Sequence, residues 1–154
     1  QRLRIPRKGA SKLIDDYFES FPAIRSFIDG TIAFARENGY VETVFGRRRY
    51  LPDINSSNAT VRSLSERNAV NAPIQGTAAD IIKLAMIRVH DAMAAASLGS
   101  RMVLQIHDEL LFDVVPGEEE VLREIVVREM EHVIGLSVPM TVECNVGKNW
   151  LEAH

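Results

Sequence analysis

The chain has 154 residues, of which 46% are hydrophobic and 25% are charged. This length suits one hydrophobic core or one part of a larger domain, and the composition excludes a disordered tail and a low-complexity chain. No apolar stretch approaches the roughly 18 residues of a membrane helix, so we expect a cytoplasmic protein without a membrane span. The single cysteine, Cys144, excludes an internal disulfide and a multi-thiolate zinc site.

The net charge of −3 is distributed unevenly along the chain. Residues 1–101 contain 15 Lys and Arg against 10 Asp and Glu, whereas residues 102–154 contain 3 against 11. A split of this kind predicts one surface that meets a polyanion and another that is negative. The negative surface is either a cation site or an ordinary solvated face.

Helical spacing of apolar residues predicts two helices at the start of the chain, over residues 10–18 and 22–38. Pro22 marks the break between them, and Gly39 is suited to end the second helix. Residues 40–51 then change to two β-prone runs around Gly46. We expect a short hairpin there, with three consecutive arginines near its tip: Arg47, Arg48 and Arg49.

A long helical pattern with one interruption follows over residues 60–97. Asn58 or Thr60 is the expected N-cap, because short polar side chains accept hydrogen bonds from the first free N–H groups of a helix. Pro73 lacks a backbone N–H and clashes with the preceding turn, so the sequence predicts a helix near 62–71 that stops or kinks before a second helix over 74–96.

The last third of the chain reads as a small antiparallel sheet with a covering helix. Residues 101–115 predict a hairpin that turns at an acidic pair, and an amphipathic helix follows Gly117. We expect residues 138–146 to form a further strand beside this hairpin, with Trp150 anchoring that strand to the core. The predicted class is α+β, a small antiparallel sheet covered by helices.

Two adjacent carboxylates, Asp108 and Glu109, follow His107 at the expected turn. Carboxylates this close repel one another, so their place between two apolar strands calls for a compensating positive charge. Mg²⁺ is held by one or two protein carboxylates together with phosphate oxygens. The pattern favours a divalent-cation site, and a solvated turn is the alternative. A third interpretation makes His107 a metal ligand, although no second His stands near it.

A second candidate site consists of Arg67, Asn71 and Gln75, which are four residues apart each time. On a continuous helix these residues share a face, and their side chains are donors that read groove edges and phosphates of nucleic acid. An exposed polar helix face is the alternative. The arginines at positions 47, 48, 49 and 62 are phosphate binders if they cluster in space, and ordinary surface charges otherwise.

Four segments of the chain form an ordered set: RRRYLPDINSSN, ERNAVNAPIQGTAADIIKLAM, VLQIHDELLFDV and GKNW. In order and separation they resemble the C-terminal part of the bacterial family A DNA polymerases. The resemblance extends from residue 5 to residue 154, and IHDELLF is its most specific element. It implies the palm and fingers portion of a polymerase, with a helical fingers part on the N-terminal side.

The resemblance implies template-directed DNA synthesis, in which two Mg²⁺ ions promote nucleotidyl transfer to a primer 3′ hydroxyl. Asp108 would be a catalytic metal ligand, Glu109 an assisting catalytic and metal-binding carboxylate, and His107 a contact near the primer end. The DNA contacts implied on the long helical segment are four: Arg62, Arg67, Asn71 and Gln75. Relatives carry two adjacent arginines where this sequence has Val61-Arg62.

The resemblance further implies that residues 1–100 are fingers-derived helices, a hairpin and long palm helices, and that residues 101–154 are the palm sheet with its covering helix. The family's other catalytic aspartate and its nucleotide-gripping fingers helix have no counterpart here and would precede Gln1. We therefore expect an inactive fragment of a longer enzyme. Its partners would be primer–template DNA and deoxynucleoside triphosphates, and exposed apolar surface would allow the fragment to self-associate.

Two other functions fit part of the pattern. A noncatalytic nucleic-acid-binding module would use only the basic first two thirds of the chain. A metal-dependent phosphohydrolase would use His107 and Asp108, but it needs further His and Asp ligands, and the spacing of His90, His132 and His154 does not supply them. Metal-dependent turnover in a longer chain separates an enzyme from the module.

Overall fold

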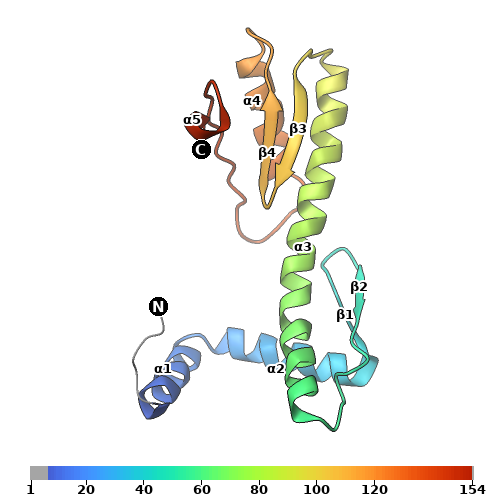
Figure 1. Ribbon diagram of the computed structural model, residues 1–154, viewed down its shortest axis with the longest axis vertical. Coiled ribbons are helices and arrows are strands. Elements are labelled where there is room, and N and C mark those ends of the chain that lie inside the picture. The colour runs from blue at the N-terminus through green and yellow to red at the C-terminus, as the bar shows by residue number, and fades with distance from the viewer. Residues whose placement is uncertain (1–6, 154) are drawn as a thin grey trace. The chain divides into compact units, whose positions relative to one another are not determined.

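The computed structural model describes residues 7–153, with side chains from residue 9 onward. The chain divides into two compact units, one with the residues up to Thr77 and one with the residues from Ala78. The division falls within a single helix, α3 (Ala59–Ala95), which contributes to both units (Figure 1). Across the described residues, no helix combines the length and the apolar character of a membrane span.

The first unit begins with the two predicted helices, α1 (Arg7–Ser20) and α2 (Pro22–Asn38). Pro22 stands at the first position of α2, where its missing N–H costs no hydrogen bond. Gly39 ends α2 in a left-handed conformation with φ of 77°, and its N–H donates to the Ala35 carbonyl at 2.8 Å. Both boundaries confirm the sequence prediction.

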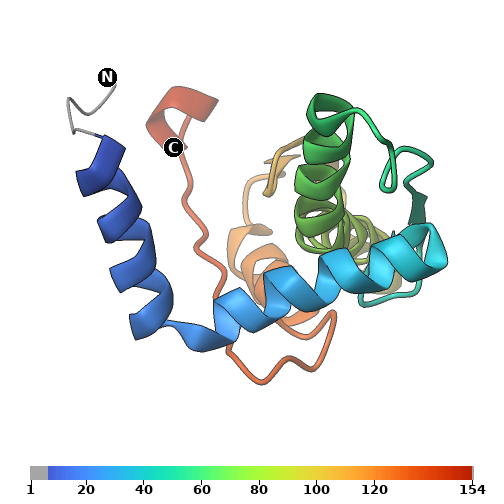
Figure 2. The same cartoon turned by 90° about the horizontal axis from the view of Figure 1, so that it is seen from below.

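The predicted first hairpin is also present, formed by β1 (Tyr40–Glu42) and β2 (Arg48–Tyr50). Gly46 lies in its turn with φ of 80°, a conformation that favours glycine. The core of this unit lies among the hairpin, α2 and the first half of α3, and Figure 2 shows α2 crossing that part of α3. The buried core residues are Ala35, Val41, Leu51, Ile54, Ala69 and Ala72.

The prediction that the helix stops at Pro73 is wrong, because α3 is assigned as one helix through that residue. A proline inside a helix removes one hydrogen bond and costs about 3 kcal/mol. Packing on both sides offsets this cost: Ala69 and Ala72 are buried before the proline, and Val89 is buried after it. The predicted N-cap is confirmed, since Asn58 Oδ1 accepts from the N–H groups at positions 60 and 61, at 3.0 and 3.3 Å.

The second unit is built on the second predicted hairpin, β3 (Arg101–Ile106) and β4 (Glu109–Asp113). The strands are antiparallel, with Ile106 opposite Glu109 and Met102 opposite Phe112. The helix α4 (Glu119–Glu131) and the second half of α3 cover one face of the hairpin. The buried core there consists of Val89, Met93, Leu122, Ile125 and Val126. A small antiparallel sheet covered by helices confirms the predicted α+β class.

The predicted strand over residues 138–146 is wrong, because this segment has no strand structure. Its backbone groups bond to α4 instead of to a strand. The Val142 N–H donates to Glu131 Oε1 at 3.0 Å, and Arg123 Nη1 donates to the Cys144 carbonyl at 2.6 Å. Within the described residues both sheets are therefore two-stranded.

The predicted role of Trp150 also needs correction. Trp150 opens a short helix, α5 (Trp150–Ala153), and does not anchor a C-terminal strand. Its side chain is 46% exposed, so it is not a core residue. It lies instead against the β3–β4 hairpin, where it lines a shallow hollow with residues from both strands.

Candidate active site and nucleic-acid contacts

The turn between β3 and β4 confirms the predicted place of Asp108. The prediction that Glu109 shares this turn is wrong, because Glu109 pairs with Ile106 as the first residue of β4. His107 and Asp108 form a two-residue connection between Ile106 and Glu109. His107 has φ of 52°, which is uncommon for a residue with a side chain and costs about 1–2 kcal/mol. Gln105 Nε2 donates to the His107 carbonyl at 2.6 Å and holds the turn. Backbone strain of this kind occurs most often at functional sites.

Two carboxylates are exposed at this end of the hairpin, that of Asp108 in the turn and that of Glu109 at the start of β4. Carboxylate oxygens are the ligands that Mg²⁺ prefers, and such sites use one or two of them together with water and substrate phosphates. The residues therefore fit part of a magnesium site. Within residues 7–153 no three His, Cys, Asp or Glu side chains gather to hold a metal.

The second candidate site lies on the first half of α3. Because α3 continues through Pro73, Arg67, Asn71 and Gln75 lie on one face, each rotated by about 40° from the last. All three are exposed, whereas Ala69 on the opposite face is buried. A stop at Pro73 would have separated Gln75 from the other two residues, and the continuous helix keeps all three on one face. These three residues belong to the first compact unit, whereas His107 and Asp108 of the β3–β4 turn belong to the second.

Arg62 is engaged within its own unit. Its Nη1 donates to the Ser56 carbonyl at 2.8 Å, and its Nε lies 3.9 Å from Glu66 Oε1. The guanidinium group has five N–H donors, so one bond to a carbonyl leaves donors that can reach a phosphate. Arg62 therefore holds the loop before α3 and still carries an available positive charge.

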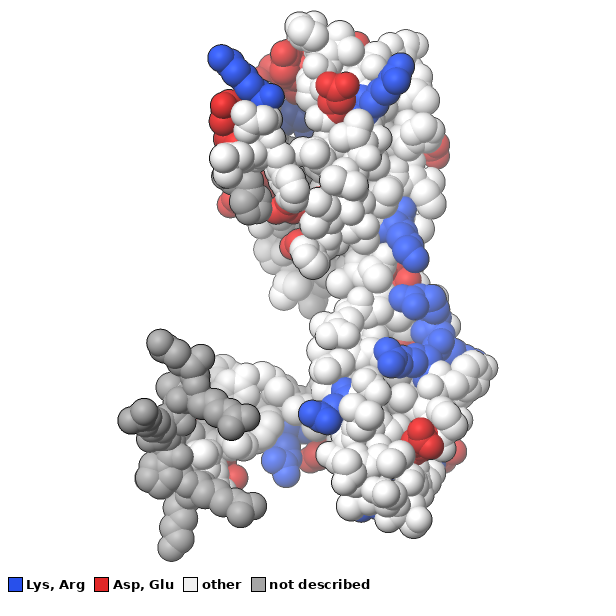
Figure 3. Space-filling model, viewed as in Figure 1, with Lys and Arg blue, Asp and Glu red and all other residues white. Residues whose placement is uncertain are grey.

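The three hairpin arginines take different positions around β1–β2, where Figure 3 shows Lys and Arg side chains gathered. Arg47 Nη2 donates to the Gly76 carbonyl at 3.0 Å. Arg48 donates to Glu42 at 2.6 Å, a hydrogen bond that raises the pKa of Arg48, and it stacks over the Tyr40 ring at 4.4 Å. Arg47 and Arg48 thus make contacts that stabilise the hairpin, and Arg49 on β2 is exposed to solvent.

Sequence reasoning missed the contact that fixes this hairpin on α3. Thr77 Oγ1 accepts from the Val44 N–H at 3.0 Å and donates to the Pro73 carbonyl at 2.6 Å. A Cβ at Gly76 would lie only 2.6 Å from Thr43 Cγ2, so the close approach requires glycine. The signal was a glycine within a helical pattern, which often marks a packing contact.

Glu118 is a second residue that sequence reasoning missed. Its carboxylate accepts from the Gly99 N–H at 2.9 Å, the Ser100 N–H at 2.9 Å and the Ser100 hydroxyl at 2.6 Å. The Ser100 hydroxyl, followed by the two backbone N–H groups, lowers the pKa of Glu118. This residue joins the start of β3 to the start of α4. In the sequence Glu118 is the first of three consecutive glutamates, and no local pattern distinguishes it from the other two.

With this geometry established, comparison with known proteins identifies the family. The model of the family described as DNA polymerase family A matches residues 1–152. The chain belongs to the family A DNA polymerases. This confirms the resemblance found in the sequence, which rested on the segments around the first hairpin, α3 and the β3–β4 turn.

Individual relatives extend this finding. The chain is 47% identical over 150 residues to DNA polymerase I of Caldicellulosiruptor bescii, covering 97% of this chain and 18% of the relative. It is 48% identical over 151 residues to DNA polymerase I of Streptococcus pneumoniae, covering 98% of this chain and 17% of the relative. The chain thus spans less than a fifth of the length of these family A polymerases.

A solved structure also matches: the polymerase domain of Pol1 from M. smegmatis in complex with DNA primer–template and dNTP. It shares 46% identity and a TM-score of 0.95, and the match covers 97% of this chain and 26% of that one. This supports the α+β fold of the chain. The roles of the individual site residues and the division near residue 100 stay predictions.

Proposed function

We propose that the chain is the C-terminal part of the polymerase domain of a template-directed DNA polymerase. Residues 1–100 would belong to the fingers and the long palm helices, and residues 101–154 to the palm. The observation that carries the proposal is the β3–β4 hairpin, which presents Asp108 in its turn and Glu109 at the start of β4 in a family A polymerase chain. The matching solved structure binds primer–template and dNTP, which supports the same partners here.

In this function Asp108 and Glu109 would hold catalytic Mg²⁺ together with carboxylates from elsewhere in the enzyme. Bound there, the metal would stabilise negative charge on the phosphates and lower the pKa of the primer hydroxyl. The protein's own contribution is positioning. The antiparallel strands fix where the two carboxylates stand, and the strained turn fixes the direction in which Asp108 leaves the backbone.

The DNA contacts follow from the exposed donors. The exposed face of α3 offers Arg67, Asn71 and Gln75 to the primer–template, and Arg62 offers its remaining donors to a phosphate. His107, beside Asp108, would contact the primer end. Because such an enzyme acts on bacterial chromosomal DNA, we place it in the cytoplasm. We also propose that the isolated fragment self-associates through its exposed apolar residues.

Family membership weighs against one of the alternative functions. A phosphohydrolase at His107 and Asp108 would need several further ligands, and membership of the family A DNA polymerases favours nucleotidyl transfer instead. A noncatalytic binding module would not require the exposed carboxylates of Asp108 and Glu109, because DNA binding uses positive and polar donors.

The deciding experiment measures the reaction products of the longer chain. With primer–template, Mg²⁺ and one nucleotide at a time, a polymerase extends the primer only with the nucleotide complementary to the template and releases pyrophosphate. A phosphohydrolase releases inorganic phosphate without extension, and a binding module shifts the DNA without turnover. Extension independent of the template base would also contradict the proposal.

A further inference from the structure

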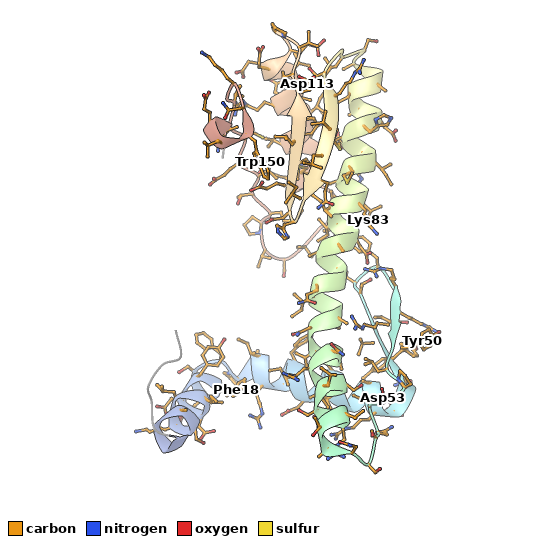
Figure 4. The ribbon with its side chains drawn as sticks, viewed as in Figure 1. Phe18, Tyr50, Asp53, Lys83, Asp113 and Trp150 are labelled. Carbon is orange, nitrogen blue, oxygen red and sulfur yellow. The ribbon has the colours of Figure 1, made fainter. Side chains whose placement is uncertain are left out.

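Trp150 and Glu109 both line a hollow on one face of the β3–β4 hairpin. The register places Ile106 opposite Glu109 and Leu104 opposite Leu111, and directly opposed residues of an antiparallel pair point to the same face. These side chains line a hollow together with Trp150, and Figure 4 shows the indole beside the hairpin. Glu109 is the only ionisable residue among those that line the hollow.

The segment that carries Trp150 is built to hold it in place. The Glu152 N–H donates to Asn149 Oδ1 at 3.1 Å, and the Glu152 carboxylate accepts from the Lys148 N–H at 3.0 Å and from Asn149 Nδ2 at 3.1 Å. These reciprocal bonds resemble a capping box. A Cβ at Gly147 would lie 2.7 Å from the Ala153 nitrogen, so only glycine permits this close return of the chain.

Burial of apolar surface does not explain this segment. The helix α5 contains no buried residue, and its Leu151 is 89% exposed. Trp150 is half-exposed as well, and it is the aromatic side chain that α5 places on the hairpin. A short, tightly capped helix that buries so little contributes little to the core. What it provides is one indole ring that lines the same hollow as the Glu109 side chain.

We propose that Trp150 is a positioning residue for Glu109. By closing the hollow along this face of the hairpin, the indole restricts the rotamers of the Glu109 side chain and keeps its carboxylate near the turn. A Glu side chain has several rotatable bonds, and an unrestricted one would lose much of its freedom each time it bound a cation. The inference rests on the proposed function, in which Glu109 is a metal-binding carboxylate.

The first experiment tests the contact without requiring any activity. Trp150 is the only tryptophan of the chain, so its fluorescence reports this site alone. Glu109→Gln should change the emission of the 154-residue chain. Asp113→Asn is the matched control, because Asp113 lies on the same strand and face about 13 Å away, and it should leave the emission unchanged. Equal emission in the wild type and Glu109→Gln overturns the proposal, whatever Glu109 does in catalysis.

The second experiment tests positioning in the longer, active chain. Trp150→Ala should lower kcat about tenfold and raise the Mg²⁺ concentration needed for half-maximal incorporation, the usual size of an effect on a residue behind a metal ligand. The KM for the nucleotide should stay nearly unchanged, and Trp150→Phe should restore part of kcat. Leu151→Ala is the control on the same helix and should behave as the wild type.

A double-mutant comparison separates this inference from the proposed function. If Trp150 acts through Glu109, Trp150→Ala should cause no further loss in a Glu109→Ala background. A further tenfold loss there would overturn the positioning role while leaving the polymerase assignment intact. Full activity of Glu109→Ala alone would instead remove Glu109 from the metal site and overturn the inference together with that part of the proposed function.

Discussion

Glu118 shows how one side chain joins two elements of the second unit. Its three hydrogen bonds reach backbone and side-chain donors at the start of β3, while the residue itself precedes the first turn of α4. The hydroxyl of Ser100 extends the connection, because it accepts from the Val115 N–H at 2.9 Å just after β4. The carboxylate therefore fixes the frame that carries the Asp108 turn.

This arrangement predicts a pH-dependent stability. The folded-state pKa of Glu118 is lowered from the usual 4.5, mainly by the Ser100 hydroxyl. A lowered pKa contributes stability that is present above the unfolded-state pKa and is lost as the pH falls through the folded-state value. Glu118→Gln should lower the free energy of unfolding at neutral pH, and the difference from the wild type should shrink in acid.

Urea unfolding followed by circular dichroism, at neutral pH and again below the lowered pKa, measures this difference. Glu124→Gln is the control, since Glu124 is exposed on α4. A difference between wild type and Glu118→Gln that stays constant over this pH range would contradict the stabilising role of the ionised carboxylate.

The exposed face of α3 leads to a second prediction at this scale. In the longer chain, alanine at Arg67, Asn71 or Gln75 should weaken primer–template binding about tenfold each, which corresponds to about 1.4 kcal/mol and the loss of one good contact. Extension past a mismatch should fall as well. The Mg²⁺ concentration for half-maximal incorporation should not change, because these residues hold no metal.

Arg25→Ala is the control for charge alone, because Arg25 lies on α2 in an exposed pair with Asp29. If the three variants on α3 bind primer–template as the wild type does, or if Arg25→Ala weakens binding equally, the assigned DNA face is wrong.

At the scale of elements, the sequence predicted most helices and both hairpins because their signals are local. Pro22, Gly39 and Gly46 mark boundaries through their own backbone preferences, and Asn58 caps α3 as expected. The same local signals placed Asp108 at a turn, because two apolar runs that flank a short acidic segment are typical of a hairpin with a polar connection.

Two of the errors arose where tertiary packing outweighs local preference. Pro73 costs a helix hydrogen bond, but the buried residues on either side keep α3 continuous. Residues 138–146 have a β-prone sequence, yet side chains of α4 take their backbone groups. The capping of α5 was readable in part, since Asn149 and Glu152 have the spacing of a capping box. The contact of Trp150 with the hairpin has no local signal.

The attachment of the first hairpin to α3 gives a prediction for an element. Gly76→Ala would place a Cβ 2.6 Å from Thr43 Cγ2, and Thr43 is buried. The hairpin would have to move, which should cost about 1–3 kcal/mol of stability. Gly30→Ala in the middle of α2 is the matched control, because nothing lies within 4 Å of that Cβ.

In the control, a helical alanine in place of glycine should stabilise the chain by about 0.5–1 kcal/mol. Chemical denaturation of both variants gives the two values. A Gly76→Ala variant as stable as Gly30→Ala would mean that the close contact between the hairpin turn and α3 is not maintained.

For the whole molecule, each compact unit has a buried core of its own. This favours a chain that folds in isolation. In the proposed function, however, Asp108 and Glu109 supply only part of the two-metal site, and the other carboxylates come from elsewhere in the enzyme. The 154-residue chain should therefore be folded and yet show no polymerase activity.

A primer-extension assay on the purified chain, with Mg²⁺ or Mn²⁺ and all four nucleotides, checks this expectation. Asp108→Asn of the same chain is the matched blank. Template-dependent extension above that blank would show that the chain contains a complete polymerase site, contrary to the proposed function.

The central claim is that Asp108 serves as a metal-binding carboxylate in DNA synthesis. Its most direct test is nucleotide incorporation by the longer chain carrying Asp108→Asn, with Asp113→Asn as the control on the same hairpin. We predict that Asp108→Asn lowers incorporation at least a hundredfold, about 2.7 kcal/mol or more in the barrier, and leaves primer–template binding nearly unchanged. Asp113→Asn should match the wild type. Near-normal incorporation by Asp108→Asn would contradict the claim.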